Sequence, residues 1–430
     1  MAKIKIGVMG AFRGLTMIKF LMKYHDAELV AVCDKYRPAL EKVRVAAEAA
    51  GMNVALYEDF EDFLKCDMEA VVLANYATQH APYAIRCLKS GRHVLSEVMA
   101  VQTLAEAVEL VETVEKTGLV YGYAENFCYF RTTMEMKLRY QRGDIGELTH
   151  AEGEYIHDCA SRWPALTYGD PNHWRNRITY STFYISHALG PIINITGLRP
   201  TRIVGFENQM YEPLYNMGCN AATAGMVVMQ MENGAMVKAL RGHLKREPVN
   251  YWTSIYGTKG CMEADRWGAD RNFRLNVYIE GEEYCKGKLD HYEPERYIDS
   301  ELSRETTGHF GADFYTGYFF LEKILGREDG KHSIDVYSAM DMCLPGILAY
   351  RSILNGNQPI DFPDFRDPAQ REKYRNDTMC TDPAIASGED LLPQNSHGMP
   401  TPPAECYEKV RKIWEEEQAK QIAMIAGSEK

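Results

Sequence analysis

Two pairs of tyrosine and histidine residues stand at spacings that place each pair on one side of its backbone segment. Tyr155 and His157 are two residues apart in a run that predicts a strand over 149–156, and alternate residues of a strand face the same side. Tyr184 and His187 are three residues apart in a segment that predicts a helix, which also gives them a common face. We therefore expect two Tyr/His pairs to reach one pocket from separate elements.

These residue types suit a reaction that moves a proton at neutral pH. Histidine titrates near ~6.5, so it can exchange a proton with a hydroxyl group while a hydride leaves the same carbon. The alternative is that all four are half-buried packing residues whose hydroxyls and ring nitrogens are satisfied within the protein. We expect no metal site, because the candidate ligands lack a close spacing such as H-E-x-x-H; these ligands are His157, Asp158, His173 and His187.

The first 125 residues alternate short β-rich runs with helical stretches. We predict strands over 3–9, 27–34, 70–75, 93–96 and 120–123, and helices over 15–24, 38–50, 79–90 and 104–117. Strands separated by single helices must run parallel, with helices on both faces of the sheet. The pattern predicts a doubly wound α/β domain over residues 1–125.

A glycine turn follows the first predicted strand, with Gly7, Gly10 and Gly14 at the point where the strand becomes a helix. Backbone N–H groups and a helix N-terminus can bind a pyrophosphate there, although Phe12 replaces the usual middle glycine. Asp34 ends the next strand about 20 residues after Gly14, where a carboxylate can accept hydrogen bonds from ribose hydroxyls. A 2′-phosphate would be repelled, so NAD(H) is favoured over NADP(H).

After Arg131 the pattern changes to one more helix, to about residue 142, and then to longer alternating strands. Asn233-Gly234 separates two such runs, 226–232 and 235–240, and predicts a hairpin with a type I′ turn. We expect an α+β domain over 126–380, with a large, mainly antiparallel sheet and helices over 313–325 and 336–354. Residues 381–430 are expected to form a loop and a helix over 404–425.

The composition points to a small-molecule partner. The chain has 430 residues, a formal net charge of -12 and 46% hydrophobic residues, so it has no excess of basic residues to bind nucleic acid. No apolar run approaches the ~20 residues needed to cross a membrane, and we expect a cytoplasmic protein. The 11 cysteines form no C-x-x-C pair and are expected to be reduced thiols. An exposed sheet face would suit a dimer or tetramer.

The segment 91–97, Gly-Arg-His-Val-Leu-Ser-Glu, resembles the Gfo/Idh/MocA oxidoreductases, whose fifth strand ends in a G-K-H-V-x-x-E-K-P motif. In that family the motif's lysine usually serves the hydride-transfer site, but here Val98 and Met99 replace lysine and proline. Further segments resemble glycoside hydrolase family 109, the NAD-dependent glycosidases of this fold; they are 32–34, 125–129, 152–158, 184–191, 335–337 and 361–365. The resemblance spans roughly residues 4 to 366.

The resemblance implies two sets of site residues. Its cofactor contacts are Phe12, Arg13, Asp34, the stretch Asn75 to His80, Glu97, Val98 and Asn126. Its reaction site is lined by Glu125, Tyr155, His157, Tyr184 and His187, with Arg175 and Tyr251 as further substrate contacts. The segment between Asp158 and Tyr184 differs from the family's usual glycine-rich stretch.

The activity that the resemblance implies is cleavage of a glycoside by oxidation at C3, elimination, addition of water at C1 and re-reduction, with NAD recycled. His187 or Tyr184 would take the C3 hydroxyl proton, Tyr155 the C2 proton, and Glu125 or His157 would serve the leaving group. One alternative is a net NAD-dependent sugar or cyclitol dehydrogenase, and another is a non-catalytic NAD- or sugar-binding protein. Glu125 has its own alternative, a charge at a strand end paired with a neighbouring base.

Overall fold

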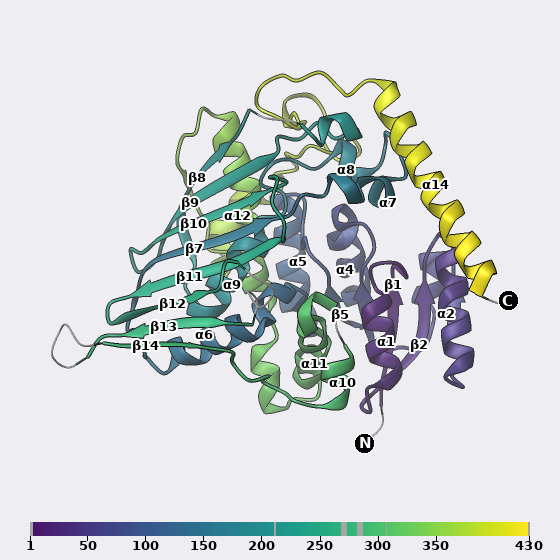
Figure 1. Ribbon diagram of the computed structural model, residues 1–430, viewed down its shortest axis with the longest axis horizontal. Helices are drawn as coiled ribbons and strands as arrows, with labels where there is room; N and C mark the ends of the chain where they lie inside the picture. Colours follow the sequence, from purple (N-terminus) through teal and green to yellow (C-terminus); the bar gives the residue numbers. More distant parts are fainter. Residues whose placement is uncertain (1–2, 210–211, 268–272, 282–286, 307, 429–430) are drawn as a thin grey trace.

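The computed structural model describes residues 3–209, 212–267, 273–281, 287–306 and 308–428, with side chains described up to residue 420. Its strands form a six-stranded and a nine-stranded sheet, which lie on either side of a layer of helices (Figure 1). None of the helices described is both long and apolar enough to span a membrane.

The six-stranded sheet has the order β3-β2-β1-β4-β5-β6, and its paired strands run parallel. The strands are β1 (Ile4–Met9), β2 (Ala27–Cys33), β3 (Ala55–Tyr57), β4 (Ala70–Leu73), β5 (His93–Ser96) and β6 (Tyr121–Tyr123). The connecting helices are α1 (Leu15–Lys23), α2 (Arg37–Ala49), α3 (Phe60–Leu64), α4 (His80–Lys89) and α5 (Leu104–Thr117). The doubly wound architecture predicted from the sequence is confirmed.

β3 and α3 are short and were not predicted from the sequence. β3 has three half-buried residues, too few for an alternating pattern to emerge. Asp59 begins α3, because its carboxylate accepts hydrogen bonds from the N–H groups of Glu61 and Asp62 at 2.8 and 3.1 Å. Phe63 of α3 then packs on Gly7, where a Cβ would lie 2.6 Å from the ring. Gly7 is therefore needed for the packing of β1 against α3.

The second sheet has the order β14-β13-β12-β11-β7-β10-β9-β8-β15. Its strands are β7 (Leu148–Ile156), β8 (Pro200–Glu207), β9 (Ala224–Met231), β10 (Met236–Gly242), β11 (Asn250–Gly257), β12 (Gly260–Ala264), β13 (Leu275–Ile279), β14 (Lys288–Tyr292) and β15 (Ile360–Asp361). Among the described strands of this sheet only β7 and β10 pair in parallel. The predicted mainly antiparallel sheet is confirmed.

The predicted hairpin joins β9 to β10, but its turn is not type I′. The N–H of Met231 donates to the carbonyl of Ala235 at 2.8 Å, which leaves a three-residue loop. Only Gly234 in this loop has a positive φ, +88°, whereas a type I′ turn needs a second residue with positive φ. The side-chain oxygen of Asn233 instead accepts a hydrogen bond from the N–H of Ala235 at 3.1 Å, which stabilises the loop.

Helices cover one face of this sheet, which we call the inner face. They include α9 (Ser186–Thr196) and α12 (Val336–Leu354). α9 lies so close that a Cβ at Gly153 of β7 would be 1.9 Å from the carbonyl oxygen of Ala188. Because strand residues alternate, Tyr155 faces the same side as Gly153 and points toward α9. α11 (Ala312–Ile324) packs against α1 and so connects the helical layer to the parallel sheet.

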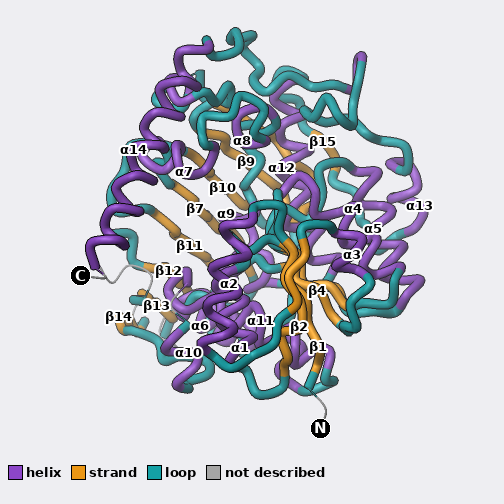
Figure 2. The backbone as a smooth tube through the Cα atoms, turned by 90° about the vertical axis from the view of Figure 1, so that its right-hand side faces the viewer, coloured by secondary structure: helices purple, strands orange, loops and turns teal. Residues whose placement is uncertain are grey.

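The last helix is α14 (Ala404–Ser428), which extends along the outside of the molecule (Figures 1 and 2). It packs on α7 (Trp163–Thr167) and on the residues that follow it. Gly169 has φ +65°, and a Cβ there would lie 2.5 Å from the carbonyl oxygen of Tyr407. The remaining helices are α6 (Arg131–Gln141), α8 (Trp174–Arg177), α10 (Glu301–Glu305) and α13 (Pro368–Arg371).

Candidate functional site

The glycine turn between β1 and α1 is braced by Asp34. Gly10 has φ +98°, and a Cβ there would lie 2.3 Å from the carbonyl oxygen of Ala74, so the turn requires glycine. The Asp34 carboxylate accepts hydrogen bonds from the N–H groups of Ala11 and Tyr36 at 2.7 and 2.8 Å. The carboxylate therefore stands beside the turn at the end of β2, where a nucleotide ribose would meet it.

Two further residues of the turn differ in their surroundings. Gly14 is the N-cap of α1, and a Cβ there would lie 2.4 Å from the carbonyl oxygen of Gly10. The Phe12 side chain is 69% exposed, which is unusual for so large an apolar group. An apolar surface is thus presented at the mouth of the turn, next to the N-terminus of α1.

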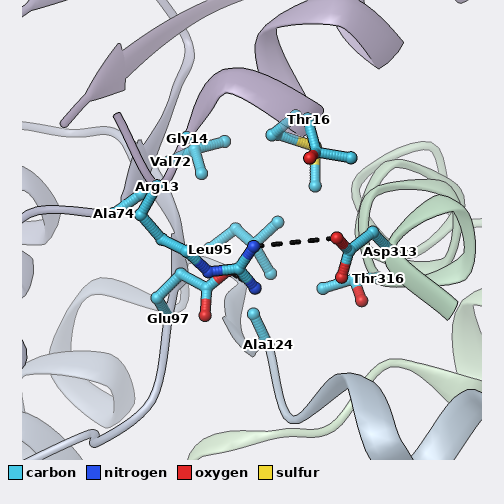
Figure 3. Close-up of a pocket in the computed structure, with 11 residues that line it drawn as sticks. Arg13, Gly14, Thr16, Val72, Ala74, Leu95, Glu97, Ala124, Asp313 and Thr316 are labelled. Atoms are coloured by element: carbon cyan, nitrogen blue, oxygen red, sulfur yellow. Dashed lines mark ion pairs between the residues drawn. The ribbon is translucent and has the colours of Figure 1, made fainter. Parts of the chain in front are cut away.

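The side chain of Arg13 extends from the same turn and forms an ion-pair cluster with Glu97 and Asp313 (Figure 3). Its guanidinium is 2.7 Å from the Glu97 carboxylate at the end of β5 and 3.7 Å from Asp313 of α11. Burial raises the pKa of Glu97, although Arg13 opposes the shift. A cation therefore meets Glu97 even though Val98, which is 8% exposed, replaces the lysine of the family motif.

Asp313 is a functional candidate that the sequence analysis missed. Asn126 donates to its carboxylate at 2.7 Å, and Nδ1 of His309 lies 3.0 Å from both carboxylate oxygens. Burial alone would raise the pKa of Asp313, but His309 and Arg13 lower it well below its ordinary range. Asp313 lies 187 positions from Asn126 in the chain, and no local pattern marks it.

Asn75 and His80 lie where β4 passes into α4. The His80 ring nitrogens are 2.9 Å from the carbonyl oxygen of Met99 and 3.3 Å from that of Asn75. Burial lowers the pKa of His80 to about 4, so the ring is neutral at pH 7. His80 therefore connects the ends of two neighbouring strands. Asn75 is half-buried and follows Ala74, which lines a pocket together with Arg13, Gly14, Glu97 and Asp313; we call this pocket the cofactor cleft (Figure 3).

Glu125 and His187 form a carboxylate–histidine pair between the end of β6 and α9. Nδ1 of His187 lies 2.7 Å from Oε1 of Glu125, and the glutamate side chain has 0% exposure. The His187 ring stacks on Phe127, with centroids 4.3 Å apart and planes at 22°. This arrangement fixes the imidazole plane and leaves Nε2 as the nitrogen available to a substrate.

Tyr155 and His157 share the inner face of the sheet, as predicted. The Tyr155 hydroxyl is 3.3 Å from Nδ1 of His157, which follows the last residue of β7. Burial lowers the pKa of His157 to about 4, so the ring is neutral at pH 7 and can accept a hydrogen bond from the phenol. Tyr251 of β11 stacks on Tyr155 at 5.7 Å, and the Tyr155 and His187 rings are 4.8 Å apart.

Tyr184 reaches the site from a different backbone segment than expected. The prediction that Tyr184 and His187 share a helix is wrong, because α9 begins at Ser186 and Tyr184 lies in the preceding turn. The rings of Tyr184 and His187 are still nearly parallel, at 12° and 5.8 Å. Arg175 of α8 lies over the Tyr184 ring at 5.6 Å, so these two predicted substrate contacts are neighbours.

Two parts of the chain match known protein families. A family model described as the oxidoreductase family with an NAD-binding Rossmann fold matches residues 4–125. A second model, described as the C-terminal domain of glycosyl hydrolase 109, matches residues 215–372. The chain therefore resembles the Gfo/Idh/MocA oxidoreductases and, among them, the glycosyl hydrolase 109 branch. These matches confirm the resemblance and the NAD cofactor predicted from the sequence.

Relatives of this branch match most of the chain. A glycosyl hydrolase family 109 protein of Solibacter usitatus is 27% identical over 84% of this chain and 88% of its own length. A second one, from Phocaeicola vulgatus, is also 27% identical and covers 84% of each chain. Among solved structures, an oxidoreductase from Agrobacterium radiobacter in complex with NAD+, L-tartaric acid and magnesium has a TM-score of 0.67 at 15% identity. It covers 84% of this chain and 98% of that chain.

The residues present fit NAD. Three buried acceptor oxygens beside the cleft have no hydrogen-bond partner among the described residues: Asn75 Oδ1, Asn126 Oδ1 and Glu125 Oε2. Buried polar atoms are normally paired, and NAD carries ribose hydroxyl and carboxamide N–H groups that can donate to such oxygens. With the glycine turn and the Asp34 carboxylate on the same side of the sheet, the donor and acceptor set matches a dinucleotide.

Proposed function

We propose that the protein is an NAD-dependent glycosidase that oxidises a sugar, eliminates its C1 substituent, adds water and reduces the product again. The observation that carries this proposal is that two proton-transfer pairs, Glu125–His187 and Tyr155–His157, converge on one aromatic cluster. A single alcohol oxidation needs one such pair, whereas elimination and hydration need another. The names of the family 109 relatives support the same activity.

We propose His187 as the group that takes the proton from the oxidised hydroxyl. Its Nδ1–H donates to the buried carboxylate of Glu125, so Nε2 carries the lone pair and acts as base. A fully buried carboxylate is poorly placed to reach a leaving group, and Glu125 therefore acts through His187. Bound NAD+ supplies the hydride acceptor at this carbon and the hydride donor in the final reduction.

We propose Tyr155 as the group that takes the C2 proton, with His157 as its relay. Burial keeps the pKa of the Tyr155 phenol far above its ordinary value, so the phenol is protonated at rest. The Tyr155 oxygen takes the C2 proton in the same step in which its own proton passes to the neutral His157 ring at 3.3 Å, so that no free phenolate forms. The protonated His157 then serves the departing group, and Tyr184 and Tyr251 close the aromatic wall.

We propose that the cofactor is held by the turn residues Gly10, Phe12, Arg13 and Gly14, by Asp34, and by Asn75, Glu97, Val98 and Asn126. The carboxylate of Asp34 selects NAD over NADP by repelling a 2′-phosphate. The Arg13–Glu97–Asp313 cluster ties the turn, β5 and α11 together around this cleft. The division into domains at residues 125 and 380 is part of the same proposal.

Two alternatives make different predictions about cofactor turnover. A sugar or cyclitol dehydrogenase would form NADH in step with product, and a non-catalytic sensor would bind NAD and sugar but convert nothing. The decisive experiment incubates the protein with aryl α- and β-glycosides and a substoichiometric amount of NAD+, recording aglycone release and NADH absorbance together. Many aglycones released per NAD+ without NADH supports the glycosidase; NADH growing with product overturns it.

We further propose that the protein is a cytoplasmic homo-oligomer. The face of the nine-stranded sheet opposite to α9 presents large apolar side chains, of which Phe206 is 41% and Met236 60% exposed. Phe206 lies in register with Met226 and Leu240 on the neighbouring strands, so the apolar surface is continuous across β8, β9 and β10. The molar mass measured by light scattering tests the assembly. A monomeric wild-type protein would contradict the oligomer, and a Phe206→Glu variant with the same mass as wild type would show that this surface is not the interface.

A further inference from the structure

A buried arginine lies beside the tyrosines of the proposed site. Arg241 of β10 is paired in register with Tyr155 of β7, and Tyr155 is paired on its other side with Tyr251 of β11. Directly paired residues on neighbouring strands point to the same face of a sheet. The guanidinium is therefore on the inner face next to the two phenols, and the side chain is only 4% exposed.

Among the described residues, Arg241 contacts only neutral groups. It donates to the carbonyl oxygen of Ser181 at 3.2 Å and to Nε2 of His243 at 2.7 Å, and no described residue pairs with its Nε. His243 stays neutral, because burial lowers its pKa well below the ordinary value. A buried charge without a counter-charge is costly, so this cation calls for an anion in the working protein.

The carboxylates nearby have other partners. Asp158 pairs with Lys245 at 2.7 Å, and Glu125 pairs with His187. Glu207, in the same register row as Arg241, accepts hydrogen bonds from the hydroxyls of Ser181 and Ser396. Throughout the part of the chain that the structure describes, no carboxylate lies within ion-pair distance of Arg241.

Two more guanidinium groups extend this positive region towards solvent. Arg175 of α8 is half-buried, with its guanidinium over the rings of Trp174 at 4.3 Å and Tyr184 at 5.6 Å. Arg162 is exposed at the start of α7, and it is the cation that most strongly lowers the pKa of His157. Like Arg241, neither has a carboxylate partner among the described residues, so three positive charges remain uncompensated beside the Tyr155–His157 pair.

We propose that the substrate of this site carries an anionic substituent, a carboxylate or phosphate on the sugar, that binds Arg162 and Arg175. This inference rests on the proposed function and specifies its substrate class. The two accessible arginines supply the hydrogen bonds, because guanidinium groups match the planar oxygens of such anions. The buried Arg241 supplies positive potential behind them, and the bound anion offsets its charge through the electrostatic field without a direct contact.

The segment that carries Arg162 and Arg175 lies between Asp158 and Tyr184. It contains arginines, aromatic residues and two short helices. A substrate-facing segment that is rich in cations selects against a neutral sugar, since an unpaired guanidinium would have to be desolvated without compensation. The anionic group is thus a specificity element of this chain.

The experiment compares charged and neutral 4-nitrophenyl glycosides that differ only at C6, each as both anomers. The pairs are the glucuronide or the 6-phosphoglucoside against the glucoside, and the galacturonide or the 6-phosphogalactoside against the galactoside. Binding of D-glucuronate, D-galacturonate and the two sugar 6-phosphates to the NAD+-loaded protein is measured by calorimetry, with D-glucose and D-galactose as neutral controls. We expect the charged member of a pair to bind and react about tenfold to hundredfold better. The two kinds of charged sugar distinguish carboxylate from phosphate.

The variants are Arg162→Gln and Arg175→Gln, with Arg177→Gln of the same helix α8 as the matched control. Arg177 is exposed, and its charge lowers the pKa of Tyr407 of α14, away from the site. We expect the first two to reduce the charged-to-neutral preference about tenfold or more, Arg162→Lys to restore part of it, and Arg177→Gln to leave it unchanged. Raising the salt concentration should weaken only the charged ligands.

The outcomes separate this inference from the proposed function. Better turnover or binding of neutral sugars, or a preference that survives both Arg→Gln changes, overturns the anionic substrate while the glycosidase stands. Oxidation of a charged sugar with matching NADH supports the anionic substrate and overturns the glycosidase. Binding of none of the charged sugars, by calorimetry, overturns the inference whatever the panel of glycosides shows.

Discussion

Nδ1 of His187 lies 2.7 Å from the carboxylate of Glu125, and this contact connects α9 to the end of β6. Glu125 is positioned by close packing, since a Cβ at Gly190 of α9 would lie 2.7 Å from its Cγ. Its N-terminal neighbours continue β6, and its Oε1 also accepts the N–H of Phe127 at 3.4 Å. The carboxylate is therefore a fixed part of the fold, and it determines which nitrogen of His187 faces the substrate.

The Glu125→Gln variant should lose activity without losing NAD. The amide has nearly the same shape but no longer accepts as an anion, so the imidazole is less well oriented and its protonated form is less stabilised. We expect kcat to fall by about two to four orders of magnitude, with KM and the NAD dissociation constant nearly unchanged. Glu152→Gln is the control, because Glu152 pairs with Lys238 on the other face of β7. A kcat within about threefold of wild type would contradict the role of Glu125.

Tyr155 and His157 should differ in what their removal does to the pH profile. The pKa of His157 is about 4, so the ring is neutral and able to accept a proton throughout pH 5 to 8, and it loses this ability only near pH 4. His157→Asn should therefore lower kcat evenly across that range without moving any acid limb in it, and Tyr155→Phe should abolish turnover. NAD binding should survive in both variants. A limb between pH 5 and 8 that disappears in His157→Asn would show that the ring titrates there.

Local sequence patterns predicted the parts of the site that belong to one element. The glycine turn, Asp34 and the Tyr155–His157 pair all follow from residues close together in the chain. The helix predicted around Tyr184 failed because the backbone bonds there span three residues, as from Phe183 N–H to the Tyr180 carbonyl, and Thr182 donates to Gly346 of α12. Helical spacing alone does not reveal such tertiary contacts.

Long-range partners were beyond prediction from one sequence. The Asp313 carboxylate meets Arg13 and Asn126 only after α11 packs on α1, and nothing in the residues around position 313 indicates this. Arg241 and His243 are different, because they repeat the two-residue spacing of Tyr155 and His157 on the strand next to β7. The two-residue spacing is visible in the sequence, but only the parallel pairing of β7 with β10 shows that Arg241 lies beside Tyr155.

Arg13→Met should destabilise the protein, because Glu97 and Asp313 would both lose the positive charge of Arg13. Asp313 would keep His309 and Asn126, whereas Glu97 would lose its only ion-pair partner among the described residues. Breaking a buried ion pair costs about 3–5 kcal/mol, and we expect a loss near the lower bound because Arg13 is 36% exposed. Denaturant unfolding measures it. Adding Glu97→Gln to Arg13→Met should recover part of the stability; a further additive loss would contradict the pairing.

A series of packed aromatic rings connects α14, which contacts Gly169, to the cofactor cleft. Tyr168 packs on Trp414 of α14 at 5.4 Å and on His173 at 6.1 Å, and His173 packs on Tyr76 at 5.2 Å, in the loop after β4. Asp34 and Tyr36 both act on the pKa of Tyr168, so this segment lies near the ribose end of the cleft. Displacing α14 should therefore weaken NAD binding from outside the site.

Gly169→Ala tests this connection, with Gly197→Ala as its control. Both glycines are left-handed, at φ +65° and +70°, so alanine pays a similar backbone cost of about 1–2 kcal/mol at each. Only at Gly169 would the added Cβ meet α14, 2.5 Å from the Tyr407 carbonyl oxygen, whereas nothing lies within 4 Å at Gly197. We expect Gly169→Ala to lower the melting temperature further than the control and to raise the NAD dissociation constant, measured by calorimetry. Because the backbone strain is matched, equal NAD affinities in the two variants would mean that α14 stabilises the fold without supporting the cleft.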